Sequence, residues 1–341
     1  MRVRMRSAAL LSGLLVAALS LPACGGSGSG TDANTLTLYN AQHQPLAQQW
    51  VDDFTAKTGI KVNIRSGSDF ELANQIVAEG AGSPADVFIT ENSPAMALVS
   101  GKELFAPVDQ ATRDQVPAQF SSRKGDWVGI AGRSTSLVYN PSLIAAADLP
   151  KSIMDLATPA FKDKYGVAPG GADFQAIVTA VFAVNGDAAG QQWVQGLKNN
   201  AKIYQNNVAI LKAVNSGQIA AGIIYHYYWF QDRAESGDNS SKTELKFFGN
   251  HDAGGFVSIS GAGVLKSSKH AADAQKLLAY HSGKQGQELL ANSKFLEYTV
   301  GSNVPANPKL KPFSELSPPD VDLGTLNGPK IIAALQGVGL L

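Results

Sequence analysis

The chain has 341 residues, with 28 basic and 28 acidic side chains, so its formal charge is zero. Three of the basic residues and no acidic residue precede residue 24, which leaves the remainder slightly acidic and gives no reason to expect a nucleic-acid partner. The length beyond that point exceeds what one hydrophobic core usually serves, which favours two lobes.

The first 33 residues are expected to direct and anchor the protein rather than to fold with it. A basic start, "MRVRMR", precedes the short apolar run "SAALLSGLLVAALSL", which is typical of a secretory signal peptide and predicts one over residues 1–23. The sequence "LPAC" resembles a bacterial lipobox, which would leave Cys24 diacylated; the alternative is a buried free thiol. Residues 24–33 then form a lipidated, glycine-rich tether. These features predict an extracytoplasmic lipoprotein anchored to the cell membrane.

The next segment alternates between strand and helix patterns. "TLTLYN" (35–40), "KVNIRS" (61–66) and "ADVFIT" (85–90) are strand-like. Helices are predicted from "PLAQQWVDDFTAKTG", which begins with proline and ends at Gly59, from "FELANQIVAEG" and from a short segment at Pro94. This β-α-β-α-β order predicts a parallel, doubly wound sheet of the α/β class.

Open α/β sheets bind ligands beyond the carboxyl ends of their strands. His43 follows the first strand and Glu91 follows the third, so both are candidate ligand-binding residues. Each also has an ordinary interpretation, since a loop histidine is usually solvated and a glutamate before a helix often interacts with the helix N-terminus.

A second concentration of polar aromatic side chains occurs in "GIIYHYYWFQ". "QIAAGIIY" predicts a buried strand and "YYWFQDRAESG" a helix ending near Gly237, which places Tyr227 and Tyr228 at a strand-to-helix turn. Adjacent side chains diverge in a continuous strand but can converge at a turn. The alternative is an aromatic cluster that packs two elements together.

Two phenol oxygens, a carboxylate and an imidazole together form a hard, anionic donor set that matches Fe³⁺. Zinc would favour cysteine and histidine, and calcium would favour carboxylates and carbonyls. A free phenol has a pKa near ~10, so only a strongly polarising ion makes it a ligand at neutral pH.

The chain resembles the periplasmic ferric-ion-binding proteins of bacterial ABC importers over nearly all of the sequence that follows the tether. The resemblance lies in "LTLYNAQH", "SPADVFITEN", "WVGIAGRS", "LATPAFKDKYGVAP", "YYW" and "SISGAGVLKSS". By position it implies that the Fe³⁺ ligands are His43, Glu91, Tyr227 and Tyr228. It also implies a synergistic anion, carbonate or phosphate, at the metal.

The anion site matches the family less closely. Its candidate residues are Gly170, Gly171, Ala172, Asn207 and Arg133. The glycines could form a nest of N–H groups at a helix N-terminus, whereas Asp173 would repel an anion and could instead be the N-cap of that helix. Arg133 could balance the anionic site or form a surface or hinge salt bridge. Tyr225 stands where relatives often carry an asparagine.

The other histidines are expected to stay outside the metal site. His226 lies between two tyrosines and is expected to be solvated or to lie next to the ligands rather than among them. His251, His270 and His281 have the pattern of ordinary surface residues.

The resemblance further implies the type II fold of periplasmic binding proteins, with two doubly wound lobes, crossing strands and a ligand cleft between them. Lobe 1 is expected over residues 34–132 and 258–305, and lobe 2 over 133–257 and 306–341. His43 and Glu91 would then come from one lobe and the tyrosines from the other, so that bound iron favours closure.

The function implied is that of a monomeric solute-binding lipoprotein that delivers iron to an ABC permease and its ATPase. The alternative is a binding protein of the same fold for a phosphonate, a polyamine or a similar small solute. An enzyme is not expected, because the chain has neither a G-x-S-x-G elbow nor an H-E-x-x-H helix. A structural or adhesive surface lipoprotein would not explain ligand-type side chains at strand ends.

Overall fold

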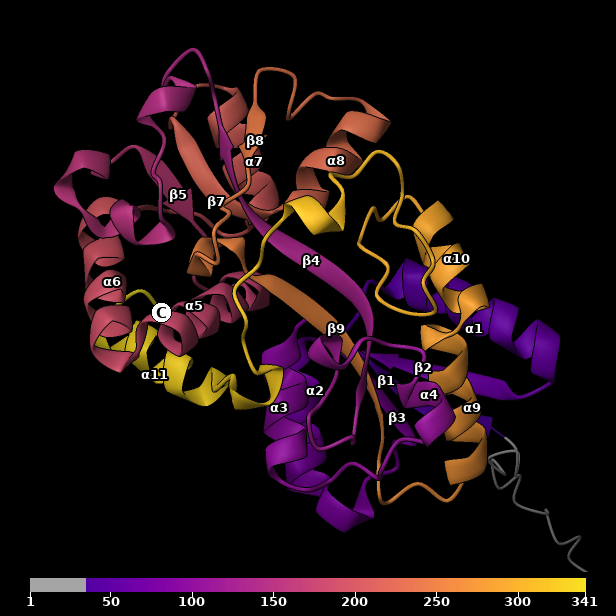
Figure 1. Ribbon diagram of the computed structural model, residues 1–341. Coiled ribbons are helices and arrows are strands. Elements are labelled where there is room, and N and C mark those ends of the chain that lie inside the picture. The colour runs from indigo at the N-terminus through magenta and orange to yellow at the C-terminus, as the bar shows by residue number, and fades with distance from the viewer. Residues whose placement is uncertain (1–34) are drawn as a thin grey trace, which may run out of the picture. The chain divides into compact units, whose positions relative to one another are not determined.

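The computed structural model describes residues 35–341, and the predicted signal peptide, Cys24 and the tether lie outside these residues. The described chain forms a mixed sheet flanked by helices (Figure 1). Its strands are β1 (Thr35–Asn40), β2 (Lys61–Ser66), β3 (Val87–Ile89), β4 (Val128–Tyr139), β5 (Tyr165–Val167), β6 (Lys202–Ile203), β7 (Ala221–Tyr225), β8 (Glu244–Lys246) and β9 (Val257–Val264). Its α-helices are α1 (Gln44–Thr58), α2 (Asp69–Glu79), α3 (Ser93–Gly101), α4 (Gln110–Arg113), α5 (Ala172–Asn185), α6 (Asp187–Asn200), α7 (Asn207–Asn215), α8 (His226–Glu235), α9 (Ala271–Ser282), α10 (Lys284–Asn292) and α11 (Gly328–Gly337).

The predicted β-α-β-α-β unit is present. β1 pairs in parallel with both β2 and β3, and α1 and α2 connect these strands in sequence. Helix α1 has a proline in its first turn and ends at Gly59, whose φ of 73° is the left-handed conformation that glycine adopts most easily. The apolar side chains of α1, including Trp50 and Phe54, are buried against the sheet.

Two long strands join the halves of the molecule. The sheet order is β2-β1-β3-β9-β4-β7-β5-β6, with β8 on β4. Strand β4 pairs with β9 over its first half and with β7 over its second half, both antiparallel. In Figure 1, β4 and β9 run diagonally from the part that holds β1–β3 to the part that holds β7 and α5.

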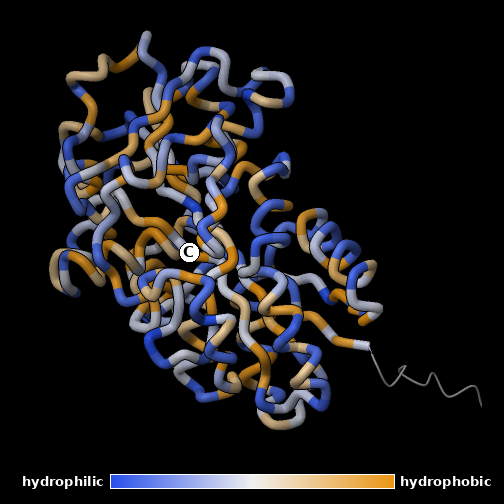
Figure 2. The backbone as a smooth tube through the Cα atoms, turned by 45° about the vertical axis from the view of Figure 1, so that its right-hand side comes forward, coloured by the Kyte–Doolittle hydropathy of each residue, from blue (hydrophilic) through white to orange (hydrophobic). Residues whose placement is uncertain are grey.

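The buried apolar side chains form one large cluster around β1, β3 and β9 and two others around β5, β7 and α7. Figure 2 shows apolar stretches of the chain, in orange, in the middle of both halves of the molecule. The C-terminal segment contributes to both halves, because Leu316 belongs to the first cluster and Leu335 to the second. Where each moving lobe begins and ends stays a prediction.

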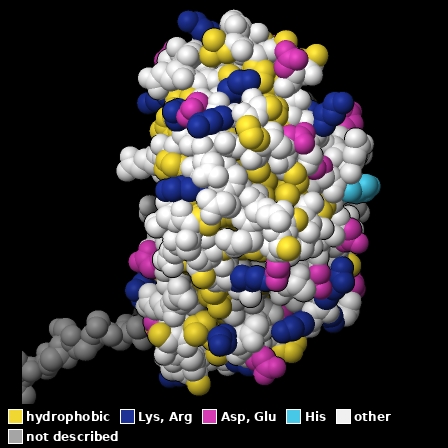
Figure 3. Space-filling view, turned by 90° about the vertical axis from the view of Figure 1, so that its left-hand side faces the viewer, with side chains coloured by type: hydrophobic (Ala, Val, Ile, Leu, Met, Phe, Trp, Pro, Cys, Tyr) yellow, Lys and Arg dark blue, Asp and Glu magenta, His cyan; other side chains and the backbone are white. Residues whose placement is uncertain are grey.

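Among residues 35–341 no helix combines the length and apolar character needed to cross a membrane. On the face of the molecule shown in Figure 3, basic and acidic side chains are interspersed.

Candidate metal centre

The four residues expected to bind iron follow the carboxyl ends of three strands. His43 follows β1 and stands at the N-cap position of α1, and Glu91 follows β3. Tyr227 and Tyr228 lie in the first turn of α8, directly after β7. The strand-to-helix turn predicted for the two tyrosines is therefore present.

These side chains meet in space although they are far apart in the sequence. His43 Nδ1 lies 3.1 Å from Glu91 Oε1. The ring centroids of His43 and Tyr227 are 5.3 Å apart, and those of Tyr227 and Tyr228 are 4.2 Å apart in a stacked arrangement. The structure thus brings together residues from the β1–β3 part and from the β7–α8 part.

Asp173 adds a second carboxylate to this group. It lies in the first turn of α5 and is 5% exposed. Asp173 Oδ2 accepts hydrogen bonds from the Tyr228 hydroxyl at 3.0 Å, from the Tyr227 hydroxyl at 3.4 Å and from Asn207 Nδ2 at 2.8 Å. The N-cap of α5 is Gly171, so the interpretation of Asp173 as N-cap is wrong.

In the turn expected to bind an anion, the Gly171 N–H is already hydrogen-bonded within the chain. It donates to the Ala168 carbonyl at 3.0 Å. The side-chain amide of Asn207, expected at the anion, donates to Asp173 instead. A carboxylate of the chain therefore occupies the surroundings in which a bound anion was expected, at the positive end of the α5 dipole.

Burial sets the protonation of these groups in the metal-free protein. It raises the pKa values of the Tyr227 and Tyr228 hydroxyls well above 10, and the Asp173 charge raises them further. Burial, with a contribution from Arg133, lowers the pKa of His43 to about 3. His43 is therefore neutral near pH 7, and its Nε2 is a buried atom without a hydrogen-bond partner. A neutral imidazole with a free nitrogen is the form that binds a metal.

The donor set at this position is one imidazole, two carboxylates and two phenols. Among residues 35–341 no group of three or more His, Cys, Asp and Glu side chains is arranged to hold a metal ion, so a metal here would depend on the tyrosines. Oxygen-rich, anionic donors of this kind suit Fe³⁺ better than zinc or calcium.

Arg133 is fully buried, so a surface salt bridge is excluded. Its Nη2 lies 3.0 Å from Glu297 Oε1 and donates to Gln42 Oε1 at 2.6 Å, and its Nη1 donates to the Glu91 carbonyl. The guanidinium also lies 5.7 Å from the centre of the Tyr227 ring. Glu297, which stands in no motif recognised in the sequence, is fully buried and lies 3.5 Å from His43 Nε2.

One histidine expectation is met and one is corrected. His226 lies next to a candidate ligand, with its ring centroid 6.1 Å from that of Tyr227, and it is buried rather than solvated: its Nδ1 accepts from the Ser134 N–H at 3.1 Å and its Nε2 lies 3.0 Å from the Leu296 carbonyl. His281 is fully buried in α9, against Trp50, and is not a surface residue. His251 is exposed and His270 partly exposed, as expected.

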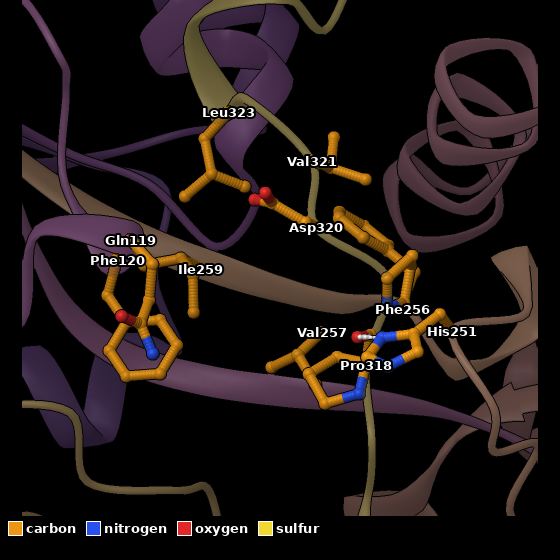
Figure 4. Close-up of a pocket in the computed structure, with 11 residues that line it drawn as sticks. Gln119, Phe120, His251, Phe256, Val257, Ile259, Pro318, Asp320, Val321 and Leu323 are labelled. Atoms are coloured by element: carbon orange, nitrogen blue, oxygen red, sulfur yellow. Dashed lines mark hydrogen bonds between the residues drawn. The ribbon is translucent and has the colours of Figure 1, made fainter.

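A pocket of about 420 Å³ lies on the other face of β9 from this group (Figure 4). Val257 and Ile259 line the pocket, whereas Ser258 and Ser260, which alternate with them, contact Asn92 and Arg133 on the side of the metal centre. Alternate residues of a strand face opposite sides. The pocket is therefore separate from the candidate metal centre.

Comparison with known proteins gives consistent results. The family model described as bacterial extracellular solute-binding protein matches residues 82–323. The chain is 47% identical over 339 residues to the Fe(3+)-binding periplasmic protein of Serratia marcescens, covering 99% of this chain and 100% of that protein. It is 38% identical over 297 residues to the major ferric iron-binding protein of Neisseria meningitidis serogroup B, covering 86% and 88% respectively.

Among solved structures, iron-bound HitA from Pseudomonas aeruginosa matches with a TM-score of 0.83 and 40% identity, covering 89% of this chain and 99% of that one. The ferric binding protein from Campylobacter jejuni, at 21% identity and a TM-score of 0.80, supports the fold alone. The type II periplasmic-binding-protein fold expected from the sequence is thereby confirmed. The chain belongs to the bacterial extracellular solute-binding proteins, in the family of periplasmic ferric-ion-binding proteins.

Proposed function

We propose that this protein captures Fe³⁺ between its two lobes with His43, Glu91, Tyr227 and Tyr228. The observation that carries the proposal is the convergence of these side chains from separate strand ends, with His43 3.1 Å from Glu91 and the tyrosine rings 4.2 Å apart. Relatives whose names state ferric-iron binding support the same cargo.

We further propose that Asp173 takes the part of the synergistic anion. Its Oδ2 already faces both tyrosine hydroxyls, and Asn207 donates to the same oxygen. When Fe³⁺ displaces the phenol protons, the carboxylate loses its hydrogen-bond donors on the tyrosines and can face the metal instead. Phosphate or carbonate at Gly170, Gly171 and Ala172, balanced by Arg133, is the alternative.

Delivery is proposed to follow the arrangement of ABC importers. The loaded protein would dock on a permease, whose ATPase drives release, and the diacylated Cys24 with residues 24–33 would keep a monomer at the membrane surface. The family membership supports transport rather than catalysis.

The test is titration of the purified mature protein with Fe³⁺ while the visible spectrum and bound metal are measured. Phenolate-to-iron charge transfer should give an orange to red colour with one iron per chain. Absence of both the band and stoichiometric iron would refute iron capture. Binding of a phosphonate or polyamine in its place would support the alternative of an organic or oxyanionic solute.

A further inference from the structure

The side chain of Asn92, the neighbour of Glu91, is 2% exposed and makes two donor contacts to carboxylates. Its Nδ2 lies 3.0 Å from Asp69 Oδ2 and 3.1 Å from Asp173 Oδ1. Its Oδ1 accepts from the Tyr225 hydroxyl at 3.1 Å. The Ser258 hydroxyl donates to the same oxygen at 2.9 Å.

The chemistry of these partners fixes the orientation of the amide. Ionised carboxylates only accept hydrogen bonds, so the NH₂ group must face Asp69 and Asp173. Hydroxyls can donate, so the carbonyl oxygen faces Tyr225 and Ser258. All four contacts of Asn92 are then satisfied, as buried polar groups require, and the reversed amide would satisfy none of the carboxylates.

These contacts join the two halves of the molecule. Asn92 and Asp69 lie beside β3 and α2, whereas Asp173 and Tyr225 belong to α5 and β7. Asn92 occupies Oδ1 of Asp173, and the other oxygen, Oδ2, faces Tyr227, Tyr228 and Asn207. The Asp173 carboxylate is thus held at Oδ1 from the other half of the molecule and at Oδ2 from its own half.

We propose that Asn92 is a positioning residue that presents Asp173 to the metal through one oxygen and excludes an anion from solution. This inference rests on the proposed capture of iron. Because the hold on Asp173 comes from the other lobe, Asn92 completes the donor set only when the lobes are in contact. Asn92 therefore allows the closed protein to bind iron without phosphate.

The test uses Asn92→Ala and Asn92→Asp in the mature protein, with Asn140→Ala as matched control. Asn140 is also a buried asparagine with side-chain hydrogen bonds, but its partners are Val214 and Ser142. Asn92→Asp keeps the size and an oxygen for Tyr225, and it replaces the donor by a third carboxylate. Iron affinity is measured by chelator competition in buffer free of phosphate and carbonate, and again after phosphate is added.

Asn92→Ala should weaken iron binding about 10- to 100-fold without phosphate, the range known for residues that orient metal ligands, and phosphate should restore most of the loss. Asn92→Asp should lose more, because like charges would face each other, and the charge-transfer band should shift in both variants. Asn140→Ala should match the unmutated protein. If Asn92 only stabilised the fold, added phosphate would not restore the iron affinity of Asn92→Ala.

Unchanged affinity and an unchanged band in Asn92→Ala would overturn the positioning role while leaving iron capture intact. Failure of the unmutated protein to bind iron would instead refute the proposed function itself. If Asn92→Ala does not fold, Tyr225→Phe decides, since it removes one contact to Asn92 and keeps the ring. Tyr225→Phe should show a smaller loss that phosphate restores, and no loss would overturn the proposal.

Discussion

Because His281 is buried, we expect the protein to lose a defined part of its stability in acid. Its ring lies 5.0 Å from that of Trp50, and neither ring nitrogen has a hydrogen-bond partner. Burial lowers its pKa from 6.5 to about 3. The unfolded chain therefore takes up a proton below pH 6.5 that the folded protein cannot accept. The contribution of neutral His281 to the free energy of unfolding is fully present above pH 6.5 and is lost as the pH falls toward 3. At pH 5 the loss is about 2 kcal/mol.

The free energy of unfolding should be measured by urea denaturation of the iron-free protein from pH 7.5 to 4.5, for the unmutated chain, His281→Leu and His281→Gln. Other groups titrate in all three proteins, so the difference between the curves isolates His281. Both variants should gain about 2 kcal/mol relative to the unmutated protein between pH 7 and pH 5. The two variants are expected to differ in their free energy of unfolding at pH 7, because glutamine buries a polar amide and leucine does not. Neither side chain titrates, so an equal gain in both variants between pH 7 and pH 5 reports the titration of His281 and not a change in packing. Parallel curves for all three proteins would refute the reasoning.

Three further predictions concern iron and the anchor. Tyr227→Phe and Tyr228→Phe should each remove much of the charge-transfer colour without unfolding the protein, because only an oxygen is lost; a full band in the double variant would place the site elsewhere. Cys24→Ala should move the protein from the membrane fraction to the soluble fraction with iron binding unchanged, and an unmodified Cys24 thiol in protein from the native host would contradict the lipid anchor. Iron affinity should fall progressively as the pH is lowered, since the raised pKa values of the Tyr227 and Tyr228 hydroxyls make protons strong competitors; a chelator competition series at constant ionic strength that showed no pH dependence would exclude phenolate ligands.

The sequence predicted those parts of the site that local patterns determine. Strand and helix periodicity located the carboxyl ends of β1, β3 and β7, and His43, Glu91 and Tyr227 follow these ends in the structure. A position relative to a strand end is a local property. Because β1 and β3 are parallel, their carboxyl ends lie at the same edge of the sheet, so His43 and Glu91 could be expected to meet before any distance was known. Strand β7 runs antiparallel to β1 and β3, so Tyr227 approaches them from the other half of the molecule, as the predicted two-lobe arrangement requires.

The residues that the sequence did not identify depend on long-range contacts. Glu297 lies 164 positions from Arg133, its partner, and stands in no recognisable motif. Asn92 is next to Glu91, but its partner Asp173 is 81 positions away, so nothing local distinguishes it from a residue at the start of a helix. His281 has the spacing of a helix surface residue, and its burial follows from the packing of α9 against α1.

Charge explains why Asp173 and an exogenous anion are alternatives in the proposed site. Two phenolates, Glu91 and Asp173 would together supply four negative charges to an ion that carries three positive ones. Arg133 adds little to this balance, because it is paired with Glu297 at 3.0 Å. A phosphate bound at the metal together with a positioned Asp173 would raise the negative excess further within a buried, weakly screened volume, where like charges repel strongly. Asp173→Ser would remove one of those charges and leave a neutral donor, so we expect it to make iron affinity depend on phosphate. Affinity measured by chelator competition, with and without phosphate, tests this, and a large phosphate requirement in the unmutated protein would show that the glycine-rich turn before α5 still holds an anion.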